Sequence, residues 1–155
     1  IPSDIELRNN YFFKPLSWKQ DDPSYAGIRW SVKNLLEFKS GRRVLVDGNI
    51  FENIWYAVQR GGAVVITPRR AQDISVAVAD DLTFTNNIFR RIDEVVAITG
   101  FDDDDTYHRG SSKRVLFENN LFDLTAAFST CCTYQMIIQN TAKDITFNHN
   151  TFIEK

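Results

Sequence analysis

Five copies of one short pattern limit what this chain can fold into. Each copy has two apolar residues separated by one position, then two further residues, Asn, any residue and Phe. The copies read IELRNNYF, VLVDGNIF, LTFTNNIF, VLFENNLF and ITFNHNTF. The Asn column is Asn10, Asn49, Asn87, Asn120 and Asn150, and the Phe column is Phe12, Phe51, Phe89, Phe122 and Phe152. Such a repeat predicts that each copy buries its apolar residues against the next copy.

The apolar positions of each copy alternate with polar ones, which is the period of a β-strand with one buried face. A second apolar run follows in four intervals, at 35–38, 63–66, 95–98 and 136–138. No segment has helical periodicity of useful length. Strands that recur in one order indicate about five coils of a parallel solenoid, and the competing all-β arrangement is an antiparallel sandwich.

Charged residues at matching positions favour stacked coils over a sandwich. Six residues before each repeat Asn, the charge alternates in sign: Asp4, Arg43, Asp81, Arg114, Asp144. Two shorter columns also alternate, namely Glu52, Arg90, Asp123 and Arg8, Asp47. If coils stack in register about 4.8 Å apart, each Arg of the long column lies between two carboxylates. We expect these pairs to fix the register, because a shift by one coil would bring like charges together.

The two residues in the middle of the pattern have different roles. The first is Asn9, Gly48, Asn86, Asn119 or His149, all of types that tolerate positive φ, which predicts a left-handed turn position. The second is Asn in all five copies, so its side chain must be needed. Stacked Asn amides can hydrogen-bond along a column and to the turn backbone. The Phe column behind them should contribute most to the core.

The five strand–Asn–Phe units resemble those of right-handed parallel β-helix proteins, the broad superfamily of pectate lyases and related polysaccharide-active proteins. The stretches PSDIELRNNYFFKPLSW and RRVLVDGNIFENIWYAV are also similar to bacterial β-helix repeat proteins of uncharacterised function. The resemblance implies a right-handed parallel β-helix with an Asn ladder and a stacked Phe column, forming one domain over residues 1–155. It implies no single activity, because the superfamily contains lyases, hydrolases, epimerases, phage adhesins and inert scaffolds.

Composition and charge exclude several function classes. The chain has 155 residues, 43% of them hydrophobic, which suits one domain with a substantial core. Its net charge of −2 argues against general nucleic-acid binding. No stretch is long and apolar enough for membrane insertion. Cys131 and Cys132 are adjacent, so we expect them to stay reduced rather than to pair with each other.

The two ends of the repeat array carry no dedicated polar cap. We expect the end coils to be covered by missing flanking coils or by another copy of the chain in end-to-end self-association. The first residue is Ile rather than Met, which indicates a processed product or a fragment of a longer solenoid. The expected location is extracellular, at the cell surface or periplasmic.

Three insertions interrupt the repeat, at 14–34, 67–81 and 99–114, and the last two leave the same corner of adjacent coils. The third insertion holds four consecutive carboxylates, Asp102, Asp103, Asp104 and Asp105. Oxygen ligands of this kind suit calcium, and calcium assists catalysis in the lyases that the chain resembles. The alternative is a solvated acidic loop that faces Arg69 and Arg70 of the neighbouring insertion.

The candidates for catalysis are His108 and Arg109, in a polysaccharide lyase or glycoside hydrolase with its site in loops 67–81 and 99–114. No catalytic motif of the lyases or of the polygalacturonase type maps onto the chain. Most carboxylates of the first strand face also have an Arg neighbour in the stack, which favours structural pairing over catalysis; the six are Asp4, Glu6, Asp47, Asp81, Glu118 and Asp144.

Aromatic side chains are the candidates for carbohydrate binding, because a ring can stack on a sugar. They are Trp18, Tyr25, Trp30, Trp55 and Tyr56. The alternative is that the tryptophans pack the long first loop against the coil. The leading hypothesis is a noncatalytic, carbohydrate-associated β-helix segment, and the alternatives are the enzyme above and a structural module that stacks end to end.

Overall fold

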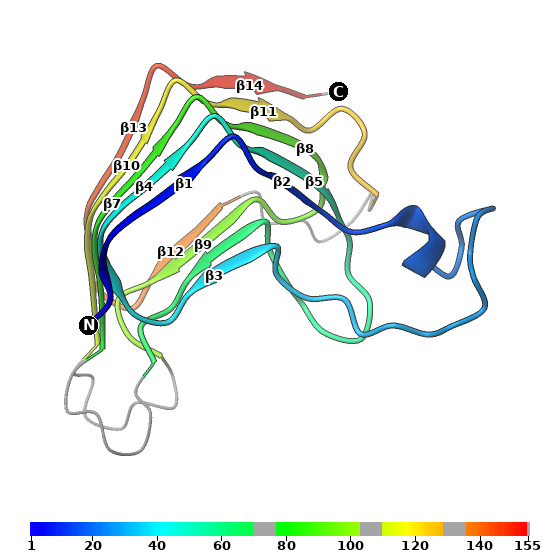
Figure 1. The fold of residues 1–155 in the computed structure, drawn as a ribbon, viewed down its shortest axis with the longest axis horizontal. Coiled ribbons are helices and arrows are strands. Elements are labelled where there is room, and N and C mark those ends of the chain that lie inside the picture. Colours follow the sequence, from blue (N-terminus) through cyan, green and yellow to red (C-terminus); the bar gives the residue numbers. More distant parts are fainter. Residues whose placement is uncertain (70–76, 103–109, 129–135, 155) are drawn as a thin grey trace.

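The computed structural model describes residues 1–69, 77–102, 110–128 and 136–154. Apart from one 3-10 turn, η1 (Leu16–Trp18), the regular structure in these residues is β, and every strand pair is parallel (Figure 1). The strands form three sheets, A, B and C, and in each sheet the spatial order follows the chain order. The prediction of stacked parallel strands is confirmed, and the antiparallel sandwich is wrong.

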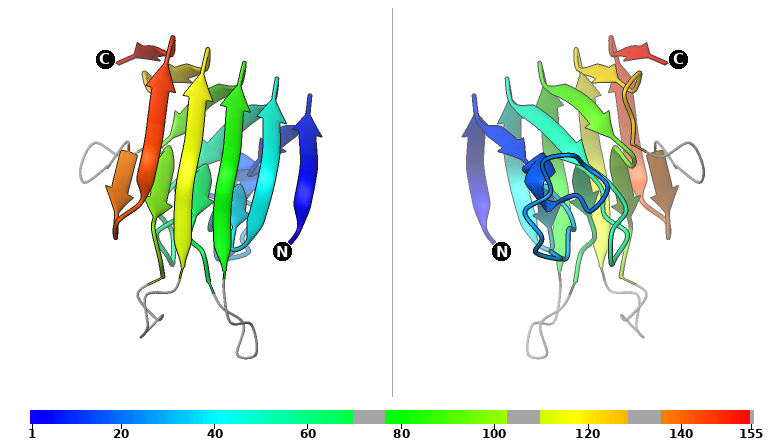
Figure 2. Two further views of the ribbon diagram at one scale, coloured as in Figure 1. Left: turned by 90° about the vertical axis from the view of Figure 1, so that its left-hand side faces the viewer. Right: turned by 90° about the vertical axis from the view of Figure 1, so that its right-hand side faces the viewer.

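Sheet A contains the alternating apolar positions of the five repeats, and its strands run side by side in Figure 2. The register joins Ile5 to Val44, Val44 to Leu82, Leu82 to Val115 and Val115 to Ile145, as the repeat requires. Its strands are β1 (Ser3–Arg8), β4 (Gly41–Asp47), β7 (Val78–Thr85), β10 (Ser111–Glu118) and β13 (Lys143–Asn148).

Sheet B begins immediately after the repeat Asn and contains the Phe column, with each Phe paired to the Phe of the next repeat. Its strands are β2 (Tyr11–Phe13), β5 (Ile50–Ile54), β8 (Ile88–Ile92), β11 (Leu121–Asp123) and β14 (Thr151–Ile153).

Sheet C is formed by the second apolar run of the first four repeats, as predicted. Its strands are β3 (Leu36–Phe38), β6 (Val64–Ile66), β9 (Val96–Thr99) and β12 (Met136–Gln139). Each of these four repeats therefore gives one strand to A, then B, then C, and the fifth gives one to A and one to B. The three sheets stay open, with β1 and β13 as the edge strands of sheet A.

The core lies between the three sheets and is dominated by stacked aromatic rings. Val44 of sheet A, Phe51 of sheet B and Val64 of sheet C belong to one buried cluster. Ring centroids along the Phe column are 4.6–4.9 Å apart. A second stack in sheet A joins Phe84 to Phe117 at 4.5 Å. Because such stacking adds to apolar burial, the aromatic columns carry much of the packing energy.

Left-handed backbone recurs at two positions of every repeat. The predicted turn position has φ between 49° and 67° in all five copies, which confirms that prediction. The alternating-charge column is also left-handed, with φ of 58° at Asp4, 53° at Arg43 and 59° at Asp81. At this column, the register passes from Ser3 to Ile5 on β1 and from Arg42 to Val44 on β4. The charged side chains therefore project from a bulge-like kink that every strand of sheet A shares.

This kink corrects two predicted boundaries. The insertions 67–81 and 99–114 were expected to end at the start of the apolar alternation, but β7 begins at Val78 and β10 at Ser111. The alternation of apolar and polar residues is interrupted at the left-handed residue. The part of each strand that precedes the kink therefore carries no period-two pattern that would identify it as a strand.

Candidate functional site

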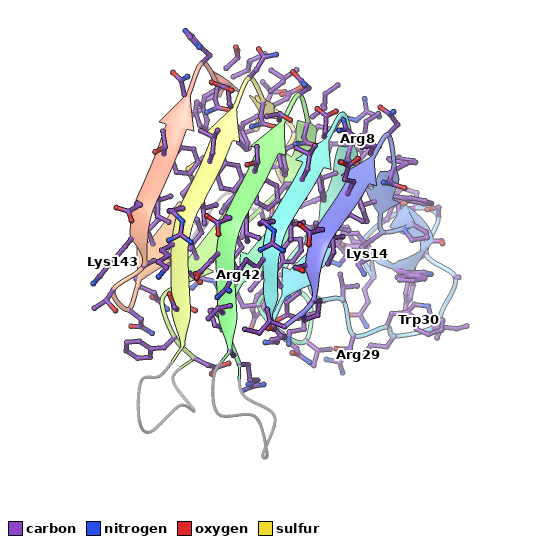
Figure 3. All side chains as sticks on the ribbon, turned by 60° about the vertical axis from the view of Figure 1, so that its left-hand side comes forward. Arg8, Lys14, Arg29, Trp30, Arg42 and Lys143 are labelled. Carbon is purple, nitrogen blue, oxygen red and sulfur yellow. The ribbon has the colours of Figure 1, made fainter. Side chains whose placement is uncertain are left out.

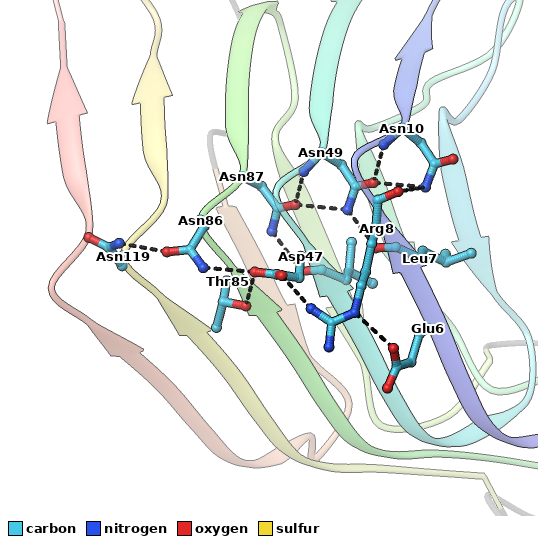
Figure 4. Close-up of polar contacts among 11 residues, drawn as sticks. Glu6, Leu7, Arg8, Asn10, Asp47, Asn49, Thr85, Asn86, Asn87 and Asn119 are labelled. Atoms are coloured by element: carbon cyan, nitrogen blue, oxygen red, sulfur yellow. Dashed lines mark hydrogen bonds and ion pairs between the residues drawn. The ribbon is translucent and has the colours of Figure 1, made fainter.

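The Asn ladder joins all five repeats at the turn between sheets A and B, and Figure 4 shows its first three residues, Asn10, Asn49 and Asn87. Each of the first four Asn donates its Nδ2 to the Oδ1 of the next Asn across 2.9–3.0 Å. The same Oδ1 also accepts the backbone N–H of the preceding Asn. The second hydrogen of Asn87 Nδ2 goes to the carbonyl of Val46 at 2.9 Å. The amides of Asn49, Asn87 and Asn120 are fully used within the stack, so the ladder is structural.

The long charge column forms two of the four ion pairs that the alternation predicts, Asp4 with Arg43 and Asp81 with Arg114. Arg43 Nε and Nη2 each lie 2.6 Å from the carboxylate of Asp4, and Arg114 holds Asp81 in the same way. Each Arg binds the preceding Asp directly, whereas Arg43 attracts the following Asp81 only at longer range. The Arg43 guanidinium holds the pKa of Asp4 at about 2, well below its usual value. Hydrogen bonding to Arg114 likewise lowers the pKa of Asp81.

The shorter columns are also paired. Asp47 accepts from Arg8 at 2.6 Å, from Thr85 at 2.9 Å and from Asn86 at 2.7 Å (Figure 4). Arg90 lies 3.0 Å from Glu52, as the second column predicts. Most carboxylates of the strand face therefore already accept hydrogen bonds in the folded state, which fits structural pairing.

One charged cluster was not predicted. Asp80 is 1% exposed on β7 and accepts a hydrogen bond from Ser111 Oγ at 3.2 Å. Arg42, Lys113 and Arg114 approach its carboxylate to 3.9 Å. The sequence feature that could have revealed this cluster is the position just before the charge column. There Asp80 lies in register with Arg42 of one neighbouring repeat and with Lys113 of the other. Since the Asp is buried beneath three cations, we interpret it as a structural anchor for them.

The aromatic candidates do come together. Trp18, Trp30, Trp55 and Tyr56 line one pocket of about 360 Å³, between the first long loop and the segment that follows β5. The rings of Trp18 and Trp30 lie 5.2 Å apart with an interplanar angle of 31°. Trp55 is buried, whereas Trp30 is 43% exposed and Tyr56 is 68% exposed. Trp55 therefore packs in the core, whereas Trp30 and Tyr56 present surface to solvent, and their role in carbohydrate binding stays a prediction.

Polar side chains surround these rings. Lys19, Gln20, Asp21, Arg29 and Asp93 line the same pocket. Lys19 pairs with Asp21, and this hydrogen bond lowers the pKa of the Asp21 carboxyl. Figure 3 shows Arg29 and Trp30 projecting from the loop at one side of the sheets. A pocket with exposed rings and a rim of charges and amides suits a ligand that has both apolar faces and hydroxyl groups.

Phe128 and Asp93 are among the pocket residues that sequence reasoning missed, and one candidate does not line the pocket. Phe128 packs edge-on against Trp55, with ring centroids 5.6 Å apart. Asp93 is 7% exposed and accepts the backbone N–H of Phe128 at 2.7 Å. Neither residue belongs to the repeat, so no pattern marked them. Tyr25 is in the first loop but is absent from the pocket lining.

Of the candidate residues in loops 67–81 and 99–114, the structure describes only Arg69 and Asp102. Arg69 Nε lies 2.8 Å from Asp102 Oδ2, so the two insertions meet where the structure describes them. This ion pair fits the acidic-loop interpretation at Asp102. The other candidates of these loops lie outside the described residues: Arg70, Asp103, Asp104, Asp105, His108 and Arg109. Cys131 and Cys132 also lie outside them.

Within residues 1–69, 77–102, 110–128 and 136–154, no group of three or more His, Cys, Asp or Glu is arranged to hold a metal ion. In the same ranges, no helix is long and apolar enough to span a membrane. Comparisons of the chain with protein-family models, with curated proteins and with solved structures give no match.

Proposed function

We propose that this chain is a noncatalytic, carbohydrate-binding segment of a right-handed parallel β-helix of the pectate lyase-like kind. The fold part is supported by the strict order of sheets A, B and C in successive repeats and by the continuous Asn and Phe columns. The binding part is supported by the aromatic pocket beside that stack.

The observation that carries the proposal is the position of the tryptophans. The chain has three, and Trp18, Trp30 and Trp55 all line the same pocket. Packing accounts for Trp55, which is 5% exposed, but not for the 43% exposure of Trp30 or for the neighbouring Tyr56. Large rings left in solvent beside a concave surface are typical of a binding site.

The chemistry of the pocket fits a sugar. A pyranose ring presents a flat C–H face, which packs on an indole, and hydroxyl groups around its edge, which form hydrogen bonds. Gln20 and Arg29 at the rim supply hydrogen-bond donors, and the Lys19–Asp21 pair supplies both signs of charge.

A glycan array probed with three proteins tests the binding. We expect the unmodified chain to bind at least one oligosaccharide class, and Trp30→Ala to lose that signal at least about tenfold, since a stacked ring is a typical binding hot spot. The matched control is Tyr25→Ala, which removes an aromatic side chain of the same loop that does not line the pocket. The absence of any signal above background for the unmodified chain contradicts the proposal, as does equal loss in both variants.

A separate assay tests whether the chain is noncatalytic. Acidic polysaccharides are incubated with the protein, with and without calcium, and the products are followed by ultraviolet absorbance and by reducing ends. We expect neither unsaturated products nor new reducing ends. Formation of either would favour an enzyme with its site in loops 67–81 and 99–114.

A further inference from the structure

The five repeats are of two alternating kinds. Type R repeats have Arg six residues before the ladder Asn and a carboxylate two residues before it, as in Arg43 with Asp47 and in Arg114 with Glu118. Type D repeats have Asp at the first position and a hydrogen-bond donor at the second. They are the first, third and fifth repeats, with Asp4 and Arg8, Asp81 and Thr85, and Asp144 and Asn148.

The two kinds bind each other at both positions. Where a type R repeat follows a type D repeat, the Arg guanidinium of the type R repeat donates two hydrogen bonds to the Asp of the type D repeat, as at Asp4 and at Asp81. Its carboxylate accepts from the donors of type D neighbours, because Asp47 accepts from Arg8 and from Thr85. Paired hydrogen bonds between ions are directional as well as strong, so they select the neighbour.

The outer face of the fifth repeat has the type D arrangement without a following repeat among the described residues. Asp144 lies on the edge strand β13, at the register position of Asp4 and Asp81, with φ of 54°. Arg114 attracts it only at longer range, from the preceding repeat. Asp4 and Asp81 show what this position binds when another repeat follows.

The ladder and the core end on the same face. Asn150 accepts from Asn120 at 2.9 Å and donates to the carbonyl of Phe117 at 2.8 Å. In each earlier repeat, the Asn also donates its N–H and Nδ2 to the next Asn Oδ1. Beside Asn150, Phe152 is 46% exposed and Ile153 is 43% exposed. The face therefore combines donors, a carboxylate and apolar surface in the arrangement that holds the inner repeats together.

We propose that this face is a docking surface for a type R repeat: a parallel strand–turn–strand unit with the pattern Arg, five residues, Asn, one residue, Phe. Its Arg would bind Asp144, its Asn would accept from Asn150, and its Phe would cover Phe152. The pattern is that of RVLVDGNIF and RVLFENNLF in this chain. One residue before Asp144, Lys143 lies in register with Lys113 of the preceding repeat. Because two cations already share this position, it does not discriminate between type R and type D neighbours.

A second copy of the chain fits this face poorly. The parallel strands and the one-way ladder require a copy to stack head to tail, with β1 against β13. In that arrangement Asp4 of the second copy lies beside Asp144. No guanidinium is then available to Asp144 at this position, because Arg43 of the second copy is bound to its own Asp4. Two like charges at one register position disfavour the contact.

The test extends the protein by one repeat. Residues 91–123, which include the type R strand β10, are appended after Ile153, which corresponds to Arg90 in register. The matched control has Arg→Asp at the appended copy of Arg114. We expect the amides of β13 to exchange at least about tenfold more slowly in the first protein than in the control, because edge amides become paired in a stable repeat.

A charge-conserving variant guards against simple misfolding of the control. Arg→Lys at the appended copy of Arg114 keeps the positive charge next to Asp144 and should retain slower exchange than the Arg→Asp control. Equal protection by the parent extended protein and the Arg→Asp control, protection by neither, or loss of all protection in the Lys variant would overturn the proposal. So would concentration-dependent association of the unextended protein that protects β13, because that result assigns the face to a second copy.

Discussion

The Nδ2 of Asn87 donates to the Oδ1 of Asn120 across 2.9 Å, and the backbone N–H of Asn87 donates to the same oxygen across 2.9 Å. One side-chain oxygen thus joins two groups of the preceding turn, and four such junctions connect five repeats. Gly, Asn or His can occupy the position before, but only an amide provides both the acceptor and the donors that this geometry needs.

Asn87→Ala should therefore destabilise the fold by roughly 2–4 kcal/mol, because it leaves several buried partners unpaired. The measurement is the free energy of unfolding from urea denaturation. The control is Asn10→Ala at the exposed start of the ladder, where Asn49 still receives the backbone N–H of residue 10. The ladder interpretation fails if the Asn10 variant loses as much stability as the Asn87 variant.

The Phe column gives a second graded prediction. Phe89 is fully buried, with stacked neighbours on both sides, whereas Phe152 is 46% exposed at the end of the column. Phe89→Ala should cost about 3–5 kcal/mol of unfolding free energy, and Phe152→Ala clearly less. Equal losses in calorimetry would mean that Phe152 is covered in solution.

Acid should weaken the stack through the Asp–Arg column. The Arg43 guanidinium lowers the folded-state pKa of Asp4 from its usual 3.8 to about 2. A depressed folded pKa stabilises the fold above the unfolded pKa, and this contribution is lost as the pH falls from about 4 to about 2. Carboxyl NMR titration should give the low value in the unmodified protein.

The matched variant for that titration is Arg43→Asn, which removes the guanidinium and keeps a residue type that accepts positive φ. The pKa of Asp4 should then rise towards its ordinary range. An ordinary Asp4 pKa in the unmodified protein would show that the ion pair does not form in solution.

A close backbone approach gives the fourth prediction. A Cβ at Gly100 would lie 1.9 Å from the carbonyl oxygen of Asn140 and 2.7 Å from the backbone nitrogen of Ala142. Gly100→Ala must therefore move one turn away from the other, and we expect it to lose about 2 kcal/mol or more. Gly41→Ala is the control, since its Cβ would meet Val44 at an ordinary 3.5 Å. Similar melting temperatures for the two variants would contradict this packing.

Most of the fold could be predicted from the sequence because residues at equivalent positions of the repeat pack against each other in neighbouring coils. The Asn ladder, the Phe column, the left-handed turn and the order of the ion pairs follow from residues at fixed spacing. The second left-handed position at Asp4, Arg43 and Asp81 was not predicted, because Arg and Asp at a strand position do not signal positive φ. For the same reason, the starts of β7 and β10 were placed too late.

The pocket was predicted less completely. Trp18, Trp30, Trp55 and Tyr56 were recognised as aromatic candidates, but nothing in the sequence showed that they share one pocket while Tyr25 does not. Asp93 reaches the pocket from the third repeat and Phe128 from the fourth, and no period relates them to the first loop. Loops outside the repeat have no stacking rule, so their contacts depend on the folded structure.

The most direct test of the proposed function records the three indole N–H resonances of the protein by NMR while an oligosaccharide is added, working through neutral and acidic classes. All three tryptophans line the pocket, so each one reports on it. We predict saturable shifts of the Trp18 and Trp30 signals with at least one class, and a smaller shift of the Trp55 signal, because that ring is buried. If no class shifts these signals at millimolar concentration, the pocket is not a carbohydrate site.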